Sequence, residues 1–265
     1  MNELVQLQIT SGIGVFTLNR PESFNAFHAA MIGDLAEKLI HVSSSDDVVG
    51  IVLTGAGKAF CAGADLKWLY TCGLTPGAAL HSLAAAYHQA IVEIRRMPKP
   101  VVAAVNGLAA GGGFSMALAC DFRVMAKSAI FRQAYTSNGL SVDGGGTYTL
   151  PRLVGLAKAM EILAFDRPIP AEQALTLGLV TEVVEEGRAV DRAAAMIREI
   201  TKRPLSSFLA SKKLLTDSFH TPFEHQLEKE RELLGWCANH PNGQEGIKAF
   251  IEKRNPVYNR RAPGA

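Results

Sequence analysis

The chain has 265 residues, of which 48% are hydrophobic and 20% charged, and its formal net charge is +2. This length allows one large domain or two small ones with a substantial core. The balanced charge gives no reason to expect a nucleic-acid partner, and no apolar run approaches the length of a membrane span. We therefore expect a globular protein without a nucleic-acid or membrane partner.

The cysteines and the chain ends predict a cytoplasmic protein. Cys61, Cys72, Cys120 and Cys237 have no paired spacing, and two of them lie in apolar surroundings like buried free thiols, which suits a reducing compartment. The N-terminus alternates apolar and polar residues and lacks the pattern of a signal peptide. The histidines are scattered, so no metal site is expected.

The first part of the chain predicts strands and one helix. Residues 4–10 and 14–19 alternate apolar and polar around a short turn, which indicates a β-hairpin. Residues 28–42 carry a helical stripe of apolar residues. Residues 48–54 are an apolar run typical of a buried strand, and a loop of small residues follows it.

The middle of the chain predicts a strand, a glycine loop and a helix start. A long helix is expected over 76–96, with proline in its first turn, and a buried strand over 101–105. Four glycines in 106–113 let the backbone adopt positive φ and approach another group closely. A short apolar helix over 114–120 would present free N–H groups to an anion at its start.

The last part of the chain predicts mostly helices. A strand is expected over 122–126, followed by an irregular glycine-rich stretch over 129–146. Helices are then expected over 158–165, 171–177, 188–201, 205–217, 223–239 and 243–254, interrupted by a strand over 180–184. This order predicts an α/β (α+β) fold with a core over 1–200 and a helical C-terminal region over 201–265.

Two nucleotide-binding motifs fail on residue type. Residues 55–57 begin a dinucleotide fingerprint, but Phe60 stands at the third glycine position. Lys58 follows a glycine as in a P-loop, but Ala59 stands where serine or threonine is required.

A serine nucleophile is a further alternative. Residues 113–117 approximate the G-x-S-x-G elbow, and Asp143 and His220 follow in the order of a catalytic triad. The elbow needs its serine on the turn directly after the strand, whereas Ser115 falls inside the expected helix. A small serine packed in a helix is therefore the preferred interpretation, with a serine hydrolase as the alternative.

Two strand–loop–helix units together predict an oxyanion hole. The strands over 48–54 and 101–105 each lead into a loop of small residues and then a helix start. Backbone N–H groups from two such loops, aimed at one point, would hold the enolate oxygen of a thioester that has lost its α-proton. Each donor is typically worth roughly 3–4 kcal/mol of transition-state stabilisation.

These loops carry a family resemblance. Residues 60–66 (Phe-Cys-Ala-Gly-Ala-Asp-Leu) and 106–113 (Asn-Gly-Leu-Ala-Ala-Gly-Gly-Gly) resemble the signature loops of the crotonase (enoyl-CoA hydratase/isomerase) superfamily. Further segments also fit, at 20–26, 150–155, 174–180 and 250–254, so the resemblance covers nearly the whole chain. It implies a spiral of ββα turns with a C-terminal helical trimerisation region, and homotrimers or hexamers. It also implies an acyl-CoA thioester substrate and no permanently bound cofactor.

The resemblance also assigns the binding residues. The backbone N–H groups of Ala64 and Gly112 would be the oxyanion donors. The coenzyme A part would be bound by Asn25, Ala26, Ala62, Asp65, Leu66, Lys67, Phe250 and Lys253. The ammonium groups of the two lysines would bind its phosphates, although each could equally be an ordinary surface lysine.

The chain departs from the family pattern at both catalytic glutamates of a hydratase. By the resemblance, Ser115 stands at the first position and Tyr135 at the second. Without both carboxylates, ordinary hydration of an enoyl-CoA loses its acid–base pair. We therefore expect these two residues to line a substrate pocket and argue against hydratase activity.

Asp143 is the acid that remains, between apolar residues and three glycines. It has two interpretations: a turn or helix N-cap residue before Thr147, or a group that transfers a proton during catalysis. The resemblance favours the second, because members with an aspartate here include dienoyl-CoA isomerases, the phenylacetate-pathway ring-epoxide isomerase and 4-chlorobenzoyl-CoA dehalogenase.

These relatives use the aspartate in two different reactions. In an isomerase, Asp143 would move a proton between two carbons while the dienolate rests on the Ala64 and Gly112 donors. In a dehalogenase, it would attack an aromatic ring as a nucleophile. That enzyme has a histidine matching His88, which is also readable as one residue of the long helix, but has tryptophan where this chain has Tyr135. We expect an isomerase closest to the phenylacetate-pathway type, with a dehalogenase, a hydratase or a non-catalytic acyl-CoA-binding protein as alternatives.

Overall fold

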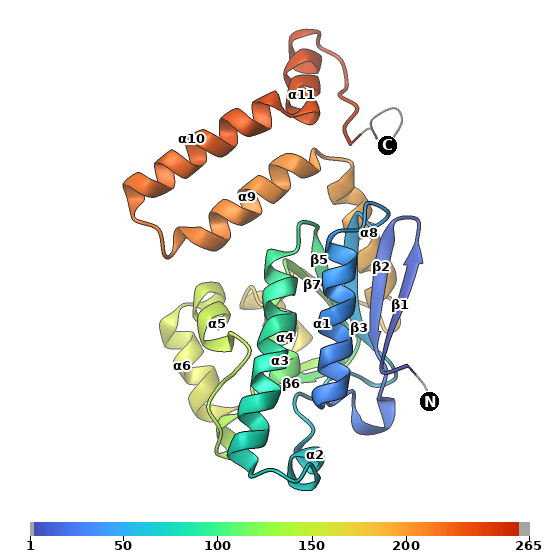
Figure 1. Cartoon of the computed structure of the whole chain (residues 1–265), viewed down its shortest axis with the longest axis vertical. Helices are drawn as coiled ribbons and strands as arrows, with labels where there is room; N and C mark the ends of the chain where they lie inside the picture. The colour runs from blue at the N-terminus through green and yellow to red at the C-terminus, as the bar shows by residue number, and fades with distance from the viewer. Residues whose placement is uncertain (1–2, 260–265) are drawn as a thin grey trace. The chain divides into compact units, whose positions relative to one another are not determined.

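The computed structural model describes residues 3–259 and divides the chain into two compact units. The first ends at Ala195 and the second begins at Met196. Figure 1 shows the first unit as a sheet with helices packed around it. This division and the one expected at residue 200 both lie in the same helix, α8 (Ala189–Thr201).

The core of the first unit is a six-stranded sheet in the order β1-β2-β3-β5-β7-β10. Its strands are β1 (Val5–Thr10), β2 (Ile13–Leu18), β3 (Gly50–Gly55), β5 (Val101–Val105), β7 (Phe122–Ala126) and β10 (Glu182–Val184). The hairpin of β1 and β2 is antiparallel, and every other pairing in this sheet is parallel. Parallel strands are covered on both faces, which explains why every residue of β3 and β5 is buried.

A smaller sheet runs in the order β4-β6-β8-β9. It contains β4 (Ala59–Cys61), β6 (Leu108–Ala110), β8 (Ile130–Arg132) and β9 (Ile169–Pro170). The strands β3, β5 and β7 of the large sheet are followed in the chain by β4, β6 and β8 of the small one. The chain therefore alternates between the two sheets before each helix, which is the ββα turn that the resemblance implies.

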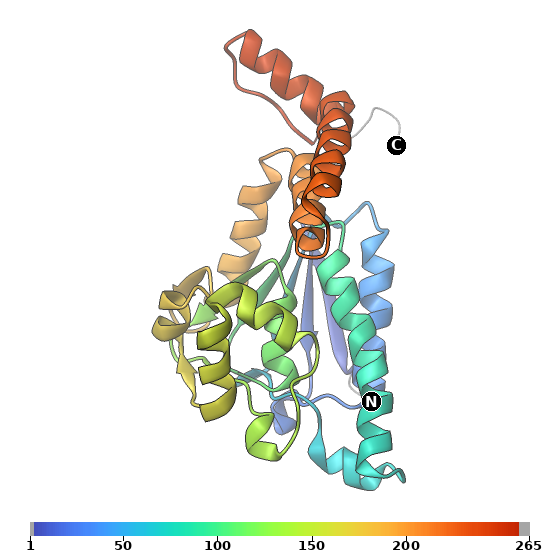
Figure 2. The same cartoon turned by 90° about the vertical axis from the view of Figure 1, so that its left-hand side faces the viewer.

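The helices of the first unit surround the two sheets. They are α1 (Ala29–Ser43), α2 (Leu66–Thr71), α3 (Pro76–Arg96), α4 (Gly112–Ala119), α5 (Gly146–Val154), α6 (Leu156–Phe165) and α7 (Ala171–Thr176), with 3-10 turns η1 (Pro21–Ser23) and η2 (Thr136–Asn138). Helices α1 and α3 lie side by side over one face of the large sheet (Figures 1 and 2). Every residue of α4 is buried, as expected for a helix that is apolar all round.

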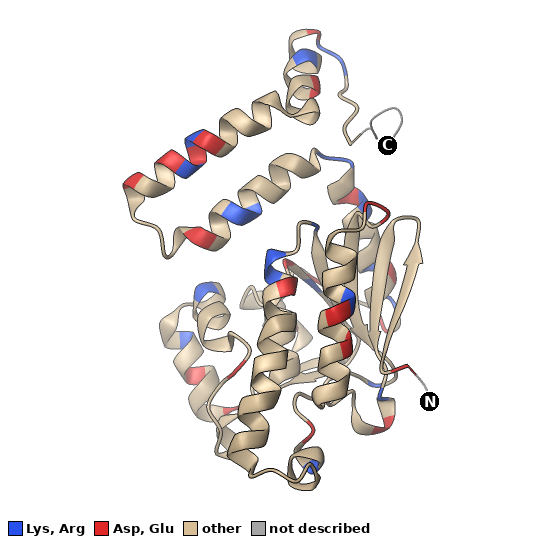
Figure 3. Cartoon of the chain, viewed as in Figure 1, with Lys and Arg blue, Asp and Glu red and all other residues tan. Residues whose placement is uncertain are grey.

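The second unit contains α9 (Leu205–Ser218), α10 (Phe223–Asn239) and α11 (Pro241–Ile251), and α10 packs against both neighbours. Charged residues gather in the N-terminal half of α10 (Figure 3). Large apolar side chains are exposed in this unit as well, among them Leu215, Phe219, Phe223, Leu234 and Phe250. The trimerisation role expected for this region stays a prediction.

The fold class is confirmed, and most long elements begin and end near their expected residues. Helix α5 has no expected counterpart, and the other exceptions are short. The glycine loop expected over 106–113 contains β6, and the irregular stretch expected over 129–146 contains β8 and η2. A three-residue strand has too few residues to show periodicity, and these strands exist because a neighbouring strand pairs with them. Among residues 3–259, no helix combines the length and apolarity needed to cross a bilayer.

Candidate active site

The two signature loops meet at Gly63 and Gly112. Strands β4 and β6 pair in parallel, so the loops after them leave the same edge of the small sheet. Gly63 has a φ of +91°, and a methyl group placed on it would lie 2.9 Å from the Gly112 nitrogen. Only glycine lets the two backbones come this close.

The backbone N–H of Ala64 is left free by the way its neighbours pair. The Phe27 N–H donates to the Gly63 carbonyl at 2.8 Å, and the Asp65 N–H donates to the Phe27 carbonyl at 2.9 Å. In this parallel bridge, Phe27 bonds to the carbonyl of the residue before Ala64 and to the N–H of the residue after it. The N–H of Ala64 therefore points away from Phe27, and it donates no backbone hydrogen bond within the described residues.

The N–H of Gly112 is free because of its position in α4. Gly112 is the first residue of the helix, after the N-cap Gly111, so its N–H has no acceptor in a preceding turn. Its carbonyl accepts a hydrogen bond from the Tyr87 hydroxyl. A Cβ at this position would lie 2.6 Å from the Phe27 ring, so a side chain there would displace the ring.

Ala64 and Gly112 both line a cavity of about 280 Å³. One part of its wall is apolar and is formed by Phe27, Leu80, Leu83, Ala84, Leu140 and Val142. The polar side chains on the wall are His81, Tyr87, Tyr135, Ser141 and Asp143. Asp143 is thus the one carboxylate among the described residues that line this cavity. Within residues 3–259, no cluster of three or more acidic, histidine or cysteine side chains is arranged to hold a metal ion.

Asp143 lies between apolar residues in the sequence, but in the structure its carboxylate has a histidine partner. Its Oδ1 lies 2.5 Å from Nε2 of His88 on α3, and its side chain is 35% exposed. The carboxylate does not cap α5, because that helix begins at Gly146 after the N-cap Gly145, and Asp143 contributes only its backbone carbonyl. The interpretation of His88 as simply one residue of a helix is therefore incomplete.

Tyr135 lines the cavity, whereas Ser115 does not. Burial raises the pKa of Tyr135, so its hydroxyl stays protonated at neutral pH. Ser115 is 1% exposed within α4 and lies beside Tyr135, outside the cavity wall. The pocket position expected for Ser115 is therefore not what the structure has. The nucleophile elbow also fails, since a serine buried in a helix cannot present its hydroxyl to a substrate.

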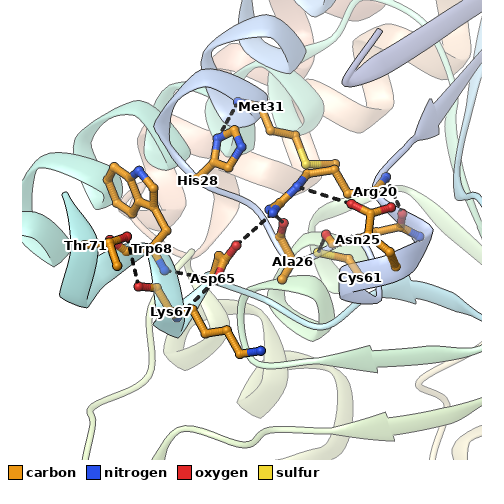
Figure 4. Close-up of polar contacts among 11 residues, drawn as sticks. Arg20, Asn25, Ala26, His28, Met31, Cys61, Asp65, Lys67, Trp68 and Thr71 are labelled. Carbon is orange, nitrogen blue, oxygen red and sulfur yellow. Dashed lines mark hydrogen bonds and ion pairs between the residues drawn. The ribbon is translucent and has the colours of Figure 1, made fainter. Parts of the chain in front are cut away.

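Asp65 organises the first signature loop (Figure 4). Its Oδ1 accepts hydrogen bonds from the N–H groups of Lys67 and Trp68 at 3.1 Å each and so caps α2. Its Oδ2 forms an ion pair with Arg20 at 2.9 Å. Burial opposes ionisation of Asp65, but the Trp68 N–H and the Arg20 guanidinium outweigh it and hold its pKa below the usual value.

Asn25 has a role within the fold. It is 0% exposed, and its side-chain amide donates to the carbonyls of Ala56 and Ala59 at 2.9 and 2.7 Å. Its Oδ1 accepts a hydrogen bond from the Arg20 N–H at 2.9 Å. All of its polar side-chain atoms are thus used to hold one turn against another, and the contact with coenzyme A expected from the sequence stays a prediction.

The other residues expected to bind coenzyme A are divided between the two units. Ala26 is buried, and its carbonyl accepts a hydrogen bond from the Arg20 guanidinium. Ala62 is half-buried within the first signature loop. Leu66 is 43% exposed, and the Lys67 ammonium lies away from the other labelled side chains in Figure 4. The remaining two, Phe250 and Lys253, belong to the second unit, so their role stays a prediction.

Sequence reasoning missed the cavity wall contributed by α3. Leu80, Leu83, Ala84 and Tyr87 repeat at helical spacing and line the cavity together. Tyr87 also stacks on Phe27, with ring centroids 4.8 Å apart. The stripe is readable as a buried helix face, but only the fold shows that this face closes the site.

Cys61 is expected to be the least reactive kind of thiol. It is fully buried, its S–H donates to the Asn25 carbonyl, and burial raises its pKa to about 12. Iodoacetamide at pH 8 should therefore modify the half-buried Cys72 and Cys237 at least about tenfold faster than Cys61, because the thiolate is the nucleophile. Peptide mass spectrometry measures the rates, with urea-unfolded protein as the control. Equal rates in the folded protein would contradict the burial.

The free N–H pair beside a small cavity, on ββα turns, is the arrangement that the resemblance to the crotonase superfamily implies. The family model described as enoyl-CoA hydratase/isomerase matches residues 8–261, and the chain belongs to this family, in the crotonase superfamily. It is 39% identical to a probable enoyl-CoA hydratase of Rhodobacter capsulatus, over 97% of this chain and 98% of that protein. It is 34% identical to 1,2-epoxyphenylacetyl-CoA isomerase of Escherichia coli K12, over 97% and 99%. A crystal structure of an enoyl-CoA hydratase from Polaromonas sp. JS666 superimposes with a TM-score of 0.90 at 36% identity, over 96% and 99%.

Proposed function

We propose that this protein is an acyl-CoA isomerase that shifts a C=C bond of an enoyl-CoA thioester, with Asp143 as its acid and base. One observation carries the proposal. Asp143 is the one carboxylate, among the described residues, that lines the cavity together with Ala64 and Gly112. A double-bond shift needs a single group that removes a proton and returns it, and hydration of the family type needs two.

The proposed reaction moves one proton. The thioester carbonyl oxygen accepts hydrogen bonds from the N–H groups of Ala64 and Gly112. Asp143 removes a proton from a carbon next to the double bond, and the electron pair moves through the chain onto the thioester oxygen. Each N–H then stabilises that oxyanion by roughly 3–4 kcal/mol. The protonated Asp143 returns the proton to a different carbon, so the product has the same atoms as the substrate and the carboxylate is restored.

His88 is proposed as a positioning residue for this step. Its Nε2 contacts Oδ1 of Asp143 at 2.5 Å, which fixes the carboxylate and leaves Oδ2 for the substrate. Because His88 is exposed, it also gives the carboxylate a connection to solvent.

The coenzyme A part is proposed to run along the first signature loop. The exposed Leu66 and the Lys67 ammonium suit the pantetheine arm and a phosphate. Phe250 and Lys253 are proposed to reach the same cofactor moiety. The exposed apolar side chains of the second unit support a homotrimer, or a hexamer made of two trimers. A cytoplasmic location is proposed from the sequence pattern described above.

Two alternatives have their own support. Hydratase activity is supported by the names of relatives, including (E)-benzylidenesuccinyl-CoA hydratase of Thauera aromatica at 34% identity. Against it, Ser115 and Tyr135 stand where the family pattern has glutamates. The His88–Asp143 contact supports a dehalogenase of the 4-chlorobenzoyl-CoA type, in which Asp143 would be the nucleophile.

A panel of CoA thioesters separates these functions. We expect a 3-enoyl-CoA to give a product of unchanged mass, with its double bond moved, as read by mass spectrometry and NMR. A product heavier by one water from a 2-enoyl-CoA would establish a hydratase and overturn the proposal. Release of chloride from 4-chlorobenzoyl-CoA would establish a dehalogenase. Binding of every thioester without turnover would leave an acyl-CoA-binding protein.

A further inference from the structure

Ser115 and Tyr135, which stand where the family pattern has glutamates, meet each other beside the cavity. Ser115 is 1% exposed within α4, and the hydroxyl oxygen of Tyr135 is buried. That oxygen lies in hydrogen-bonding contact with the Ser115 hydroxyl and with the backbone N–H of Asp143, although neither contact has regular hydrogen-bond geometry. The phenol therefore directs its polar end at the protein, and in particular at the main chain of the proposed acid.

Tyr135 contacts the segment that leads to Asp143 at two points. Its backbone carbonyl accepts a hydrogen bond from the N–H of Leu140 at 3.0 Å, and its hydroxyl meets the N–H of Asp143 three residues later. The backbone of Tyr135 is itself held by its neighbour, because the N–H of Ala134 donates to the Asp166 carboxylate at 2.8 Å. One well-anchored residue thus supports both ends of the segment 140–143.

The main chain after Asp143 is packed against the two helices on either side. Gly144 has a φ of +62°, and a methyl group on it would collide with the Tyr87 ring of α3. A methyl group on Gly146 would lie 2.8 Å from the hydroxyl oxygen of Ser115 in α4. The glycines therefore let the chain around Asp143 approach α3 and α4 closely.

These contacts account for most polar atoms of Asp143. Its N–H points to the Tyr135 hydroxyl, its carbonyl accepts from the N–H of Gly146 at 3.2 Å, and its Oδ1 lies 2.5 Å from Nε2 of His88. The place of Oδ2, the oxygen left for the substrate, depends on where these partners hold the residue. A displacement of roughly 1 Å at a reacting group can cost about 10²-fold in rate.

We propose that Tyr135 is a positioning residue for the proton transfer. Its hydroxyl, oriented by Ser115, accepts a hydrogen bond from the backbone N–H of Asp143 and fixes where the carboxylate stands in the cavity. This inference rests on the proposed role of Asp143 as acid and base. The two positions that carry glutamates in the family pattern then support the acid of this protein instead of transferring protons themselves.

Amide hydrogen exchange tests the contact without any substrate. We expect the N–H of Asp143 to exchange with deuterated water about tenfold faster in Tyr135→Phe than in wild type, because phenylalanine keeps the ring and removes only the acceptor. The N–H of Leu140 is the internal control, since it bonds to the main-chain carbonyl of Tyr135 and should keep its rate within about threefold. NMR measures both rates. Equal exchange at Asp143 in the two proteins would overturn the inference.

Steady-state kinetics on the enoyl-CoA identified by the panel tests the consequence. We expect kcat to fall by about 10–10²-fold in Tyr135→Phe, and by about threefold in Ser115→Ala, which leaves the Asp143 contact in place. Affinity for hexanoyl-CoA should stay within about threefold in both variants, because the rings and loops of the cavity remain. Tyr70→Phe is the matched control, since Tyr70 is 82% exposed, and it should keep the kcat of wild type.

A double variant separates positioning from general destabilisation. Tyr135→Phe should cause no further loss of kcat in the Asp143→Asn background, because a residue that acts through Asp143 has no acid left to position. An undiminished further loss there, or a kcat of Tyr135→Phe within about twofold of wild type, overturns the inference and leaves the proposed function standing.

The remaining outcomes are also distinct. If wild type turns over none of the thioesters, the proposed function is refuted, and this inference with it. A thermal melt confirms that each variant is folded. Should Tyr135→Phe fail to fold, Ser115→Ala decides, and the inference is overturned if that variant matches wild type both in kcat and in exchange at Asp143.

Discussion

Replacing Asp143 with asparagine is expected to lower kcat for the double-bond shift by about 10²–10⁴-fold, the usual contribution of a general acid–base group. Asparagine keeps the size of the side chain but cannot accept the proton. Affinity for a saturated acyl-CoA should stay within about threefold, because binding depends mainly on the loops and the cavity wall. Turnover is followed by NMR, and affinity by calorimetry.

Exchange of substrate protons with deuterated water isolates the same step. Wild type should exchange protons at the carbon that loses the proton and at the carbon that receives it, and Asp143→Asn should not. Asp191→Asn is the matched control, because that carboxylate is 66% exposed on α8 and does not line the cavity. A retained exchange rate in Asp143→Asn would assign the proton transfer to another group, with His88 the first to examine.

Substituting alanine for Gly63 is expected to lower kcat by about 10²–10³-fold, the loss seen when one oxyanion donor is removed. The added methyl group would lie 2.9 Å from the Gly112 nitrogen and 3.0 Å from the Ala110 carbonyl oxygen. One of the two backbones must then shift, and the Gly112 N–H loses its aim at the thioester oxygen. Steady-state kinetics on the enoyl-CoA identified by the panel measures the effect.

The strain of a positive φ has to be separated from this displacement. Gly178 has a φ of +71°, and a methyl group added there would meet no atom within 4 Å, so Gly178→Ala carries comparable strain without the contact. It should lose roughly 1–2 kcal/mol of stability and keep its kcat. Equal loss of kcat in both variants would mean that general destabilisation, rather than the donor, lowers the activity of Gly63→Ala.

The sequence predicts the repeating part of this fold well and its short parts poorly. Helix α3 and strand β5 begin and end where periodicity and β-branched residues place them. Strands β4 and β6 escape prediction because three residues carry no periodicity, although they bring the two signature loops together. Their place depends on pairing between residues as far apart in the chain as Ala59 and Leu108, which local patterns do not encode.

The candidate site shows the same division. The free N–H groups of Ala64 and Gly112 follow from loop and helix-start rules together with the resemblance. The contact of His88 with Asp143 does not, because the two residues are 55 positions apart and meet only when α3 lies beside the loop before α5. The role of Asn25 within the fold also escapes prediction, since its side chain is buried and bonds to backbone of residues as far away in the chain as Ala59.

The free N–H groups of Ala64 and Gly112 belong to the main chain, and this has an evolutionary consequence. A point mutation at Ala64 changes the side chain but leaves its N–H in place, so a donor of this kind is lost only when a substitution displaces the backbone, as is expected at Gly63. The groups that move protons are side chains, and each can be exchanged by a single substitution. Such a scaffold can acquire a new reaction by changing positions such as 135 and 143 while its hold on the thioester persists.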